Sequence, residues 1–325
     1  MEEVPAPTLA GDIAALEEEK VIEGKDGWLF LARDTNHVIH QHTGRLQFSP
    51  RSLEDWRHVL ETRRAWLARR QIPYFFLVPP NTHAVYPEYL PDDVVSVAER
   101  PVLQLMGYLH EQESEAGIIY PLDELVAHKQ HDLVYIKTDS HWNELGAFVT
   151  YKRLMREISD VVTVRDIQWE QLFVSRNDLA GDLGVKLRPE RSSTQVFVDV
   201  MGWQAHYAAD NRVRVEGRRI EYTCKLAPDV TCLVHGDSYA EKFLHILAES
   251  FGRTVFCQMP SLDYQVVQEV RPDVVIGVQN ERFLLEVPYD STAPTQRELA
   301  AAKVMQGKVY GPRTHWQTPR VDSFL

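Results

Sequence analysis

Runs of apolar residues alternate along the chain with segments in which apolar positions recur every three or four residues. The continuous runs predict strands that are covered by helices on both faces. They lie at residues 74–78, 117–120, 133–136, 231–235, 254–258 and 273–278. The periodic segments predict amphipathic helices at about 52–70, 98–113, 143–157, 238–251, 262–270 and 294–306. This order with short connections predicts an α/β fold, doubly wound, with three α/β/α layers and a mainly parallel sheet.

The alternation breaks down between about residues 160 and 230. Short apolar runs at 161–164, 195–198 and 213–215 lie there among polar loops, which is typical of antiparallel strands. We therefore expect a β-rich insertion or lid within the main domain.

The two ends of the chain differ from the rest. Residues 1–22 are polar and rich in glutamate, with a helical pattern, and a turn with a short strand follows at 24–30. Beyond Pro288 one helix and a proline-containing tail remain. The expected domains are an N-terminal segment over 1–22, an α/β domain over 23–287, and a C-terminal helix and tail over 288–325.

Composition narrows the class of protein. The 325 residues are 44% hydrophobic and 25% charged, as in ordinary globular proteins, and carry a formal net charge of -12. That charge argues against a protein that grips nucleic acid or an anionic membrane by electrostatics. The start of the sequence has no signal-peptide pattern, and no apolar stretch is long enough to span a membrane. A cytoplasmic protein is expected, or a periplasmic one if a leader is missing from this sequence.

The cysteines are too few for a disulfide framework. Cys224, Cys232 and Cys257 cannot all pair within one chain. Cys224 and Cys232 could form a bridge in an oxidising compartment, but buried thiols are the expected state.

Two short motifs carry the candidate chemistry. Asp139 and His141 stand one residue apart, so in an extended segment both side chains project to the same side and can hydrogen-bond. Ser238 follows Gly236 and Asp237 where a predicted strand meets a predicted helix, which exposes its hydroxyl at the carboxyl end of the strand. If both motifs end parallel strands, they emerge at one edge of the sheet. Together they predict a Ser-His-Asp triad.

Each motif also has a structural explanation. Asp237 or Ser238 could simply cap the following helix, and a carboxylate-oriented histidine can be structural or a metal ligand. An oxyanion would need donors, for which the backbone N–H groups of Ser238 and Tyr239 are candidates. The side chain of Asn280, just beyond the last predicted strand, is another, or it caps a turn.

No cofactor or metal is expected from the remaining motifs. His37, His40 and His42 have a spacing that could face a metal, but no carboxylate or cysteine pattern accompanies them, and surface histidines are the simpler interpretation. The glycines fit neither a dinucleotide fingerprint nor a phosphate loop.

The set of motifs resembles the SGNH-hydrolase-like polysaccharide O-acetyltransferases of the alginate acetylation type, AlgJ and AlgX. An Asp-x-His element before the nucleophile, rather than after it, distinguishes that family from ordinary SGNH esterases. The resemblance covers about residues 22–285 and rests on motifs in the family's order, at 24–30, 78–80, 85–88, 90–91, 138–143, 146–147, 181–183, 236–238, 272–276 and 281–282.

The resemblance implies roles for particular residues. Ser238 would be the nucleophile, His141 the base and Asp139 its orienting acid, in acetyl transfer to a carbohydrate hydroxyl through an acyl-serine intermediate. Trp142 and Asn81 are the expected substrate contacts, and Asn81 stands where the family commonly has lysine. The acceptor would be a carbohydrate or glycosylated small molecule, and the family's acetyl donor system is typically a membrane-bound O-acyltransferase.

Two alternatives remain open at this point. The same triad would serve a carbohydrate acetylesterase, in which water takes the acyl group. A non-catalytic carbohydrate-binding protein on the same fold is the second alternative, since Trp142, Trp169 and Trp203 could stack on sugars. The acidity of the chain makes the polyanion alginate an awkward acceptor.

Overall fold

A six-stranded sheet forms the centre of the computed structural model, which describes residues 19–311. Its strands follow the order β3-β10-β8-β9-β7-β6. The first four pair in parallel. β7 then pairs antiparallel with β9, and β6 pairs antiparallel with β7. Their bounds are Tyr74–Leu77 for β3, Val274–Val278 for β10, Thr231–Gly236 for β8, Arg253–Gln258 for β9, Arg219–Cys224 for β7 and Ala205–Asp210 for β6. The expected mainly parallel sheet is confirmed.

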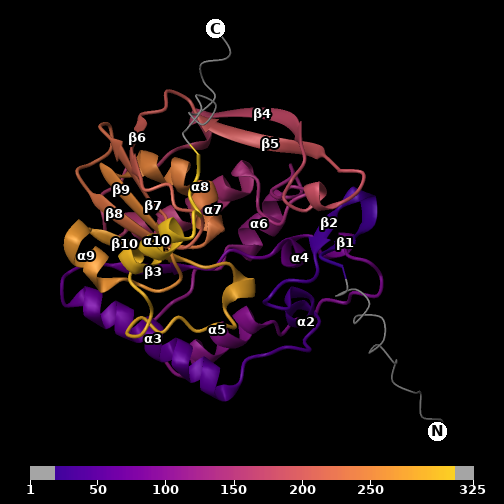
Figure 1. Cartoon of the computed structure of the whole chain (residues 1–325), viewed down its shortest axis with the longest axis horizontal. Coiled ribbons are helices and arrows are strands. Elements are labelled where there is room, and N and C mark those ends of the chain that lie inside the picture. The colour runs from indigo at the N-terminus through magenta and orange to yellow at the C-terminus, as the bar shows by residue number, and fades with distance from the viewer. Residues whose placement is uncertain (1–18, 312–325) are drawn as a thin grey trace.

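Helices cover both faces of this sheet, because its central strands are apolar on both sides. On one face α7 (Glu144–Ser159) and α8 (Ser238–Leu247) pack over side chains such as Val234 and Ile276. On the other face α3 (Pro50–Ala68) and α9 (Tyr264–Val270) enclose Leu233 and Val275. Figure 1 shows α3 along the lower edge of the molecule, with α5 (Pro101–Glu111) beside it. The result is the three-layer arrangement that the sequence predicts.

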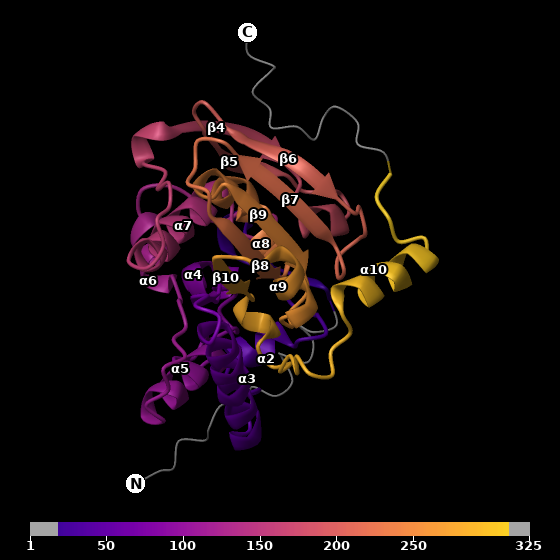
Figure 2. The same ribbon diagram turned by 90° about the vertical axis from the view of Figure 1, so that its left-hand side faces the viewer.

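Smaller elements surround the layers. β1 (Val21–Glu23) and β2 (Leu29–Leu31) form one antiparallel pair, and β4 (Leu172–Leu179) and β5 (Ser193–Val200) form another. The β4–β5 pair lies across the top of Figure 1, and α10 (Gln296–Met305) projects to one side in Figure 2. The remaining helices are α2 (Val38–His42), α4 (Thr82–Val85) and α6 (Leu122–His128). Single 3-10 turns occur at Lys25–Gly27, Pro87–Tyr89, Trp169–Gln171, Gly184–Lys186, Ala248–Ser250 and Glu281–Phe283, the last labelled η6.

The region predicted as a β-rich insertion divides into two parts. β4 and β5 form a separate pair, but β6 and β7 belong to the main sheet. Residues 161–164 form no strand, and the run at 213–215 makes only a single bridge, between Val213 and Val309. The sequence hides β6, the edge strand, and its neighbour β7, because both carry polar side chains among apolar ones.

Two predicted strands are wrong. The run at 117–120 makes only one bridge, between Ile119 and Leu77, and the run at 133–136 makes one between Tyr135 and Trp142. Only Ile119 is buried in the run at 117–120, whereas the run at 133–136 is largely buried. In the second, the Val134 N–H donates to the Tyr86 hydroxyl at 3.0 Å, so a side chain replaces a strand partner. Asp139 and His141 therefore lie on a loop outside the sheet.

Most of the predicted N-terminal segment 1–22 and the last part of the tail lie outside the described residues.

Cys224, Cys232 and Cys257 are buried and unpaired, as the sequence predicts. Burial raises the pKa of the Cys257 thiol to about 12 and raises the pKa of the Cys232 thiol well above its usual value. Within residues 19–311, every helix is too short or too polar to cross a membrane.

Candidate active site

The end of β8 presents Ser238 at the carboxyl edge of the sheet. Gly236 is needed there, because a Cβ at this position would lie 2.0 Å from the Val278 carbonyl oxygen. Asp237 then caps α8: its Oδ1 accepts from the Tyr239 N–H at 2.9 Å and its Oδ2 from the Asn280 N–H at 2.6 Å. Ser238 is the first residue of α8 and keeps partial exposure to solvent. We call this strand end with its capped helix the nucleophile arm.

Asp139 and His141 lie on residues 138–143, which we call the acid–base loop. Asp139 Oδ1 accepts two hydrogen bonds from His141, one from its backbone N–H at 2.9 Å and one from Nδ1 at 2.7 Å. A carboxylate only accepts, so Nδ1 carries the proton and Nε2 presents its lone pair. Asn143 ends the loop by capping α7, where its Oδ1 accepts from the Gly146 N–H at 2.9 Å.

The two segments meet at one hydrogen bond. His141 Nε2 lies 2.8 Å from Ser238 Oγ, and with Nε2 as acceptor the serine hydroxyl is the donor. The structure thus brings the three residues of the predicted triad into one hydrogen-bonded chain. His141 and Ser238 lie 97 residues apart in sequence. The His141 side chain keeps 12% of its surface exposed, so the reacting atoms border on solvent.

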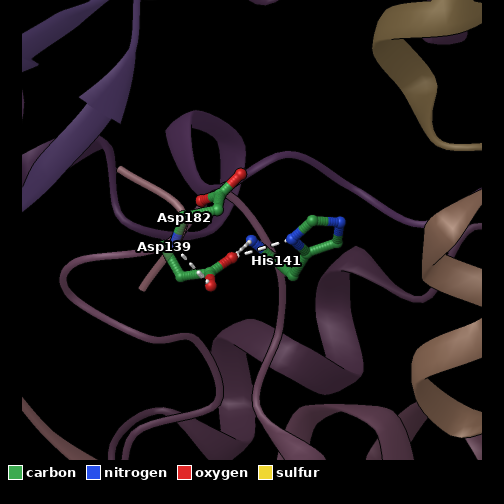
Figure 3. A group of neighbouring side chains, drawn as sticks. All are labelled: Asp139, His141 and Asp182. Carbon is green, nitrogen blue, oxygen red and sulfur yellow. Dashed lines mark hydrogen bonds and ion pairs between the residues drawn. The ribbon is translucent and has the colours of Figure 1, made fainter. Parts of the chain in front are cut away.

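A second carboxylate, which the sequence did not single out, braces the acid–base loop (Figure 3). The Asp182 N–H donates to Asp139 Oδ2 at 2.9 Å, while the Asp182 carboxylate accepts from the Ser140 N–H at 2.7 Å and from its hydroxyl at 2.8 Å. The neighbouring Gly181 allows this approach, because a Cβ there would lie 2.3 Å from the Thr138 carbonyl oxygen. The only hint in the sequence is the place of Gly181 and Asp182 among the family motifs.

Asp139, His141 and Asp182 also form the one group of at least three potential ligands, among the residues described, close enough to hold a metal ion. Their ligand atoms are already engaged. Both oxygens of each carboxylate accept hydrogen bonds, and His141 Nδ1 donates to Asp139. A cation would have to displace these donors, so the arrangement suits a proton relay better than a metal centre.

Electrostatics keep Asp139 ionised. Burial alone raises the pKa of this carboxyl, but the hydrogen bond and charge of His141, the Asp182 N–H and the nearby Lys242 together bring it well below its usual value. Asp237 behaves oppositely, since burial outweighs the two N–H donors and raises the pKa of its carboxyl. A permanently charged Asp139 is suited to stabilise an imidazolium at His141.

The predicted oxyanion donors differ in their hydrogen-bond partners. No acceptor for the Ser238 N–H occurs within residues 19–311, so this donor at the start of α8 is available. The Tyr239 N–H is engaged by Asp237. The Asn280 side chain is fully buried and donates to the Pro79 carbonyl at 2.9 Å and the Pro80 carbonyl at 3.2 Å. To serve an oxyanion, this amide would have to leave both carbonyls, so its oxyanion role stays a prediction.

Both predicted substrate contacts are buried. Trp142 is 1% exposed and packs edge-to-face against Tyr239 and Phe243, so it belongs to the core. Asn81 is 2% exposed; its N–H donates to Glu281 Oε1 at 2.7 Å, and its amide nitrogen lies 3.1 Å from His42 Nε2. Both side chains are thus engaged within the protein as it is folded here, and their contact with substrate stays a prediction.

The predicted surface position is also wrong for His42. Its ring stacks on that of His83 at 4.8 Å, and it is 1% exposed. Burial, with His83 and Arg100 nearby, brings the pKa of His42 well below its usual value. His37 is exposed, as expected, and His40 is partly exposed. The three do not form a metal site, because His42 faces the interior.

Known proteins resemble this chain in sequence. A family model described as the SGNH hydrolase-like domain of the acetyltransferase AlgX matches residues 21–259. A probable alginate O-acetylase AlgJ of Pseudomonas aeruginosa is 31% identical over 143 residues, 43% of this chain and 33% of that protein. Its counterpart in Pseudomonas syringae pv. tomato is 29% identical over 136 residues, 41% of this chain and 32% of that protein. The matches thus span about a third of these curated relatives.

Solved structures resemble it in fold. PatB1 of Bacillus cereus superimposes with a TM-score of 0.56 at 17% identity, covering 81% of this chain and 96% of that one. The O-acetyltransferase domain of Pseudomonas putida AlgJ gives a TM-score of 0.54 at 17% identity, covering 87% of this chain and 100% of that one. At such identities the likeness establishes a common fold.

Proposed function

Because this chain belongs to the family of SGNH hydrolase-like acetyltransferase domains that the AlgX model describes, we propose that it transfers an acetyl group to a carbohydrate hydroxyl. The observation that carries the proposal is the hydrogen-bonded chain from Asp139 through His141 to Ser238, which borders on solvent. Such a chain is the apparatus of acyl transfer through a covalent serine intermediate.

In the first half-reaction, Ser238 Oγ attacks the carbonyl carbon of an acetyl ester. His141 Nε2 takes the hydroxyl proton, and the carbonyl π electrons move to the oxygen to give a tetrahedral oxyanion. When that intermediate collapses, the bond to the donor's oxygen breaks, and the donor leaves as an alcohol with the proton from Nε2. Asp139 holds the imidazole in the required tautomer throughout.

The second half-reaction repeats these steps with another hydroxyl. A carbohydrate hydroxyl attacks the acetyl-serine carbonyl and gives its proton to His141 Nε2. Collapse of the second oxyanion breaks the ester bond to Ser238 Oγ, which recovers the proton. The acetyl group leaves on the carbohydrate. Water in place of the sugar would give hydrolysis, so exclusion of water from the acetyl-enzyme decides between transferase and esterase.

The oxyanion is assigned to the start of α8. The Ser238 N–H is available there, and the positive end of the helix dipole favours a negative charge at the same place. A neutral carbohydrate suits the net charge of -12 better than a polyanion does, so we place neutral glycans ahead of alginate as the acceptor.

The test is hydrolysis of an aryl acetate by variants of the triad. We expect Ser238→Ala and His141→Ala each to lower kcat by about 10⁴-fold or more, with unchanged circular dichroism. Ser159→Ala, at an exposed serine at the far end of α7, is the matched control and should keep full activity. Wild-type rates in either triad variant would refute the assignment.

Transfer and hydrolysis are separated by mass spectrometry. Neutral and acidic oligosaccharides are incubated with the protein and an aryl acetate as donor. An acetyl group gained by a neutral oligosaccharide supports the proposed transferase. Loss of acetyl groups from acetylated oligosaccharides, with none gained, would show an acetylesterase instead.

A further inference from the structure

The side chain of Tyr239 joins the two segments that carry the candidate triad. Tyr239 follows Ser238 on α8 and is completely buried. Its hydroxyl donates to the backbone carbonyl of Ser140 at 2.5 Å, across 99 residues of sequence. Ser140 stands between Asp139 and His141. One phenol therefore ties the helix of the nucleophile to the middle of the acid–base loop.

The ring of Tyr239 also occupies the space beside the base. Its centroid lies 5.0 Å from that of His141, with the planes tilted by 41°. Trp142 packs against the other part of the ring at 5.0 Å, nearly perpendicular to it. The Arg282 guanidinium lies 5.6 Å from the ring centroid. These contacts leave the imidazole little lateral freedom on this side.

Only two hydrogen bonds join residues 139–141 to α8 within the part of the chain that the structure describes. One is the bond between Ser238 Oγ and His141 Nε2, and the other is the bond from Tyr239 to Ser140. The first is the bond whose proton moves in the proposed reaction, so it breaks and reforms during turnover. The second takes no part in the chemistry and persists.

We propose that Tyr239 is a positioning residue, whose hydroxyl holds the acid–base loop against α8 and keeps His141 within reach of Ser238 while the proton moves. The role in turnover rests on the proposed acyl transfer. Burial raises the pKa of the Tyr239 phenol, so it remains a hydrogen-bond donor throughout the working range of the protein. Asp182 braces the opposite side of the same loop.

The test is Tyr239→Phe, which removes the hydroxyl and keeps the ring. We expect kcat for an aryl acetate to fall by about 10-fold to 100-fold, since small displacements of reacting groups cost that much. KM should stay the same, because the phenol lies behind the loop and is buried from the substrate. Reaction of Ser238 with a fluorophosphonate should slow in proportion to kcat.

Tyr151→Phe is the matched control. Tyr151 is as deeply buried, and its hydroxyl is bonded to Ser250 Oγ at 2.8 Å and accepts the Ile167 N–H. It stands about 12 Å along α7 from the acid–base loop, at 1.5 Å per residue. Loss of its hydroxyl should lower Tm without changing kcat.

A second readout does not depend on turnover. The proton on His141 Nδ1, in the 2.7 Å bond to Asp139, should give a low-field proton NMR signal that is absent in Asp139→Asn. We expect Tyr239→Phe to broaden this signal through faster exchange with water, and Tyr151→Phe to leave it unchanged.

The outcomes separate this inference from the proposed function. An unchanged kcat and signal in Tyr239→Phe would overturn the positioning role, as would equal losses of activity in both phenylalanine variants. If the wild-type protein lacks esterase activity, or Ser238→Ala retains it, the proposed function fails. The NMR comparison then still decides whether Tyr239 holds the loop.

Discussion

The nucleophile arm and the acid–base loop hold their reactive groups by different means. Ser238 follows a strand that is paired in parallel on both sides, with β10 and β9, and it begins a helix capped by Asp237. Residues 138–141 make no strand ladder. The Leu183 and Gly184 N–H groups donate to the Thr138 carbonyl. The rest of the loop is held chiefly by Asp182 on one side and the Tyr239 side chain on the other.

Because of this difference, we expect changes in the two segments to affect different properties: the stability of the protein in one, and the alignment of the reacting groups in the other. Changes in the nucleophile arm disturb a ladder in the centre of the sheet, so they should lower the free energy of unfolding. Changes around the acid–base loop disturb a few side-chain hydrogen bonds at the edge of the core, so they should lower activity more than stability. The same substitution made in each segment tests this contrast.

The largest contrast is expected between Asp139→Asn and Asp237→Asn. An amide at 139 can no longer fix the tautomer of His141, so kcat for an aryl acetate should fall by about 10⁴-fold. At 237 each carboxylate oxygen accepts a backbone N–H, so an amide nitrogen there faces a donor in either orientation. That variant should lose about 1–3 kcal/mol of stability and keep more activity. Urea unfolding and kcat are measured on both variants. Equal losses of stability and of kcat in the two variants would contradict the contrast.

Glycine substitutions give the next largest effect. In Gly181→Ala the new Cβ meets the Thr138 carbonyl at 2.3 Å and Asp139 Cβ at 2.5 Å, so the acid–base loop must shift. A shift of this size should cost about 10²-fold in kcat. In Gly236→Ala the Cβ meets the Val278 carbonyl at 2.0 Å inside the sheet, and Tm should fall more than in Gly181→Ala. Equal Tm values in the two variants would argue against the contrast.

A smaller effect is expected from Asp182→Ala. This change leaves the Asp182 N–H on Asp139 but removes the acceptor of the Ser140 N–H and hydroxyl. The loop should become less ordered, with kcat lower by about 10-fold. Asp166→Ala, which removes a surface ion pair with Lys152 and a hydrogen bond from the Gln168 side chain, is the control and should match the wild type in kcat. An active Asp182→Ala variant would leave Tyr239 as the main brace.

The smallest effect is a difference in how acid affects stability. The pKa of Asp139 is lowered by folding, so its contribution is present above about pH 3.9, its unfolded value, and is lost as pH falls through the folded value. The pKa of Asp237 is raised, so protonation favours the folded state and acid relieves a penalty. The free energy of unfolding, measured with urea between pH 6 and pH 3, should therefore fall less with acid in Asp139→Asn than in the wild type. In Asp237→Asn it should fall more than in the wild type. The reverse order would contradict the assigned directions.

The sequence predicts the central strands well, because only a strand buried on both faces needs a continuous apolar run that is followed by a helix. It fails at 133–136, where a run of the same kind is a buried loop held by the Tyr86 hydroxyl. Apolar character reports burial, and burial does not require a ladder. For the opposite reason β6 and β7 are missed, since the edge strand β6 and its neighbour β7 carry polar side chains among apolar ones.

For the site, residue types and spacing predict Asp139, His141 and Ser238 as a group, and the structure places them in one hydrogen-bonded chain. The sequence predicts this meeting because each motif would end a parallel strand. In the structure only Ser238 follows such a strand. Asp182 and the Tyr239 hydroxyl come from segments far away in sequence and act through backbone atoms of Ser140. Residue types carry no signal of contacts to a backbone carbonyl or N–H.

The position of β10 has a consequence for synthesis of the chain. This strand is the last of the sheet in sequence, yet it is second in the sheet order and lies between β3 and β8. Until residues up to Val278 have left the ribosome, β3 and β8 have no common partner. The nascent protein therefore holds two open strand edges, and its sheet closes only after β10 has emerged.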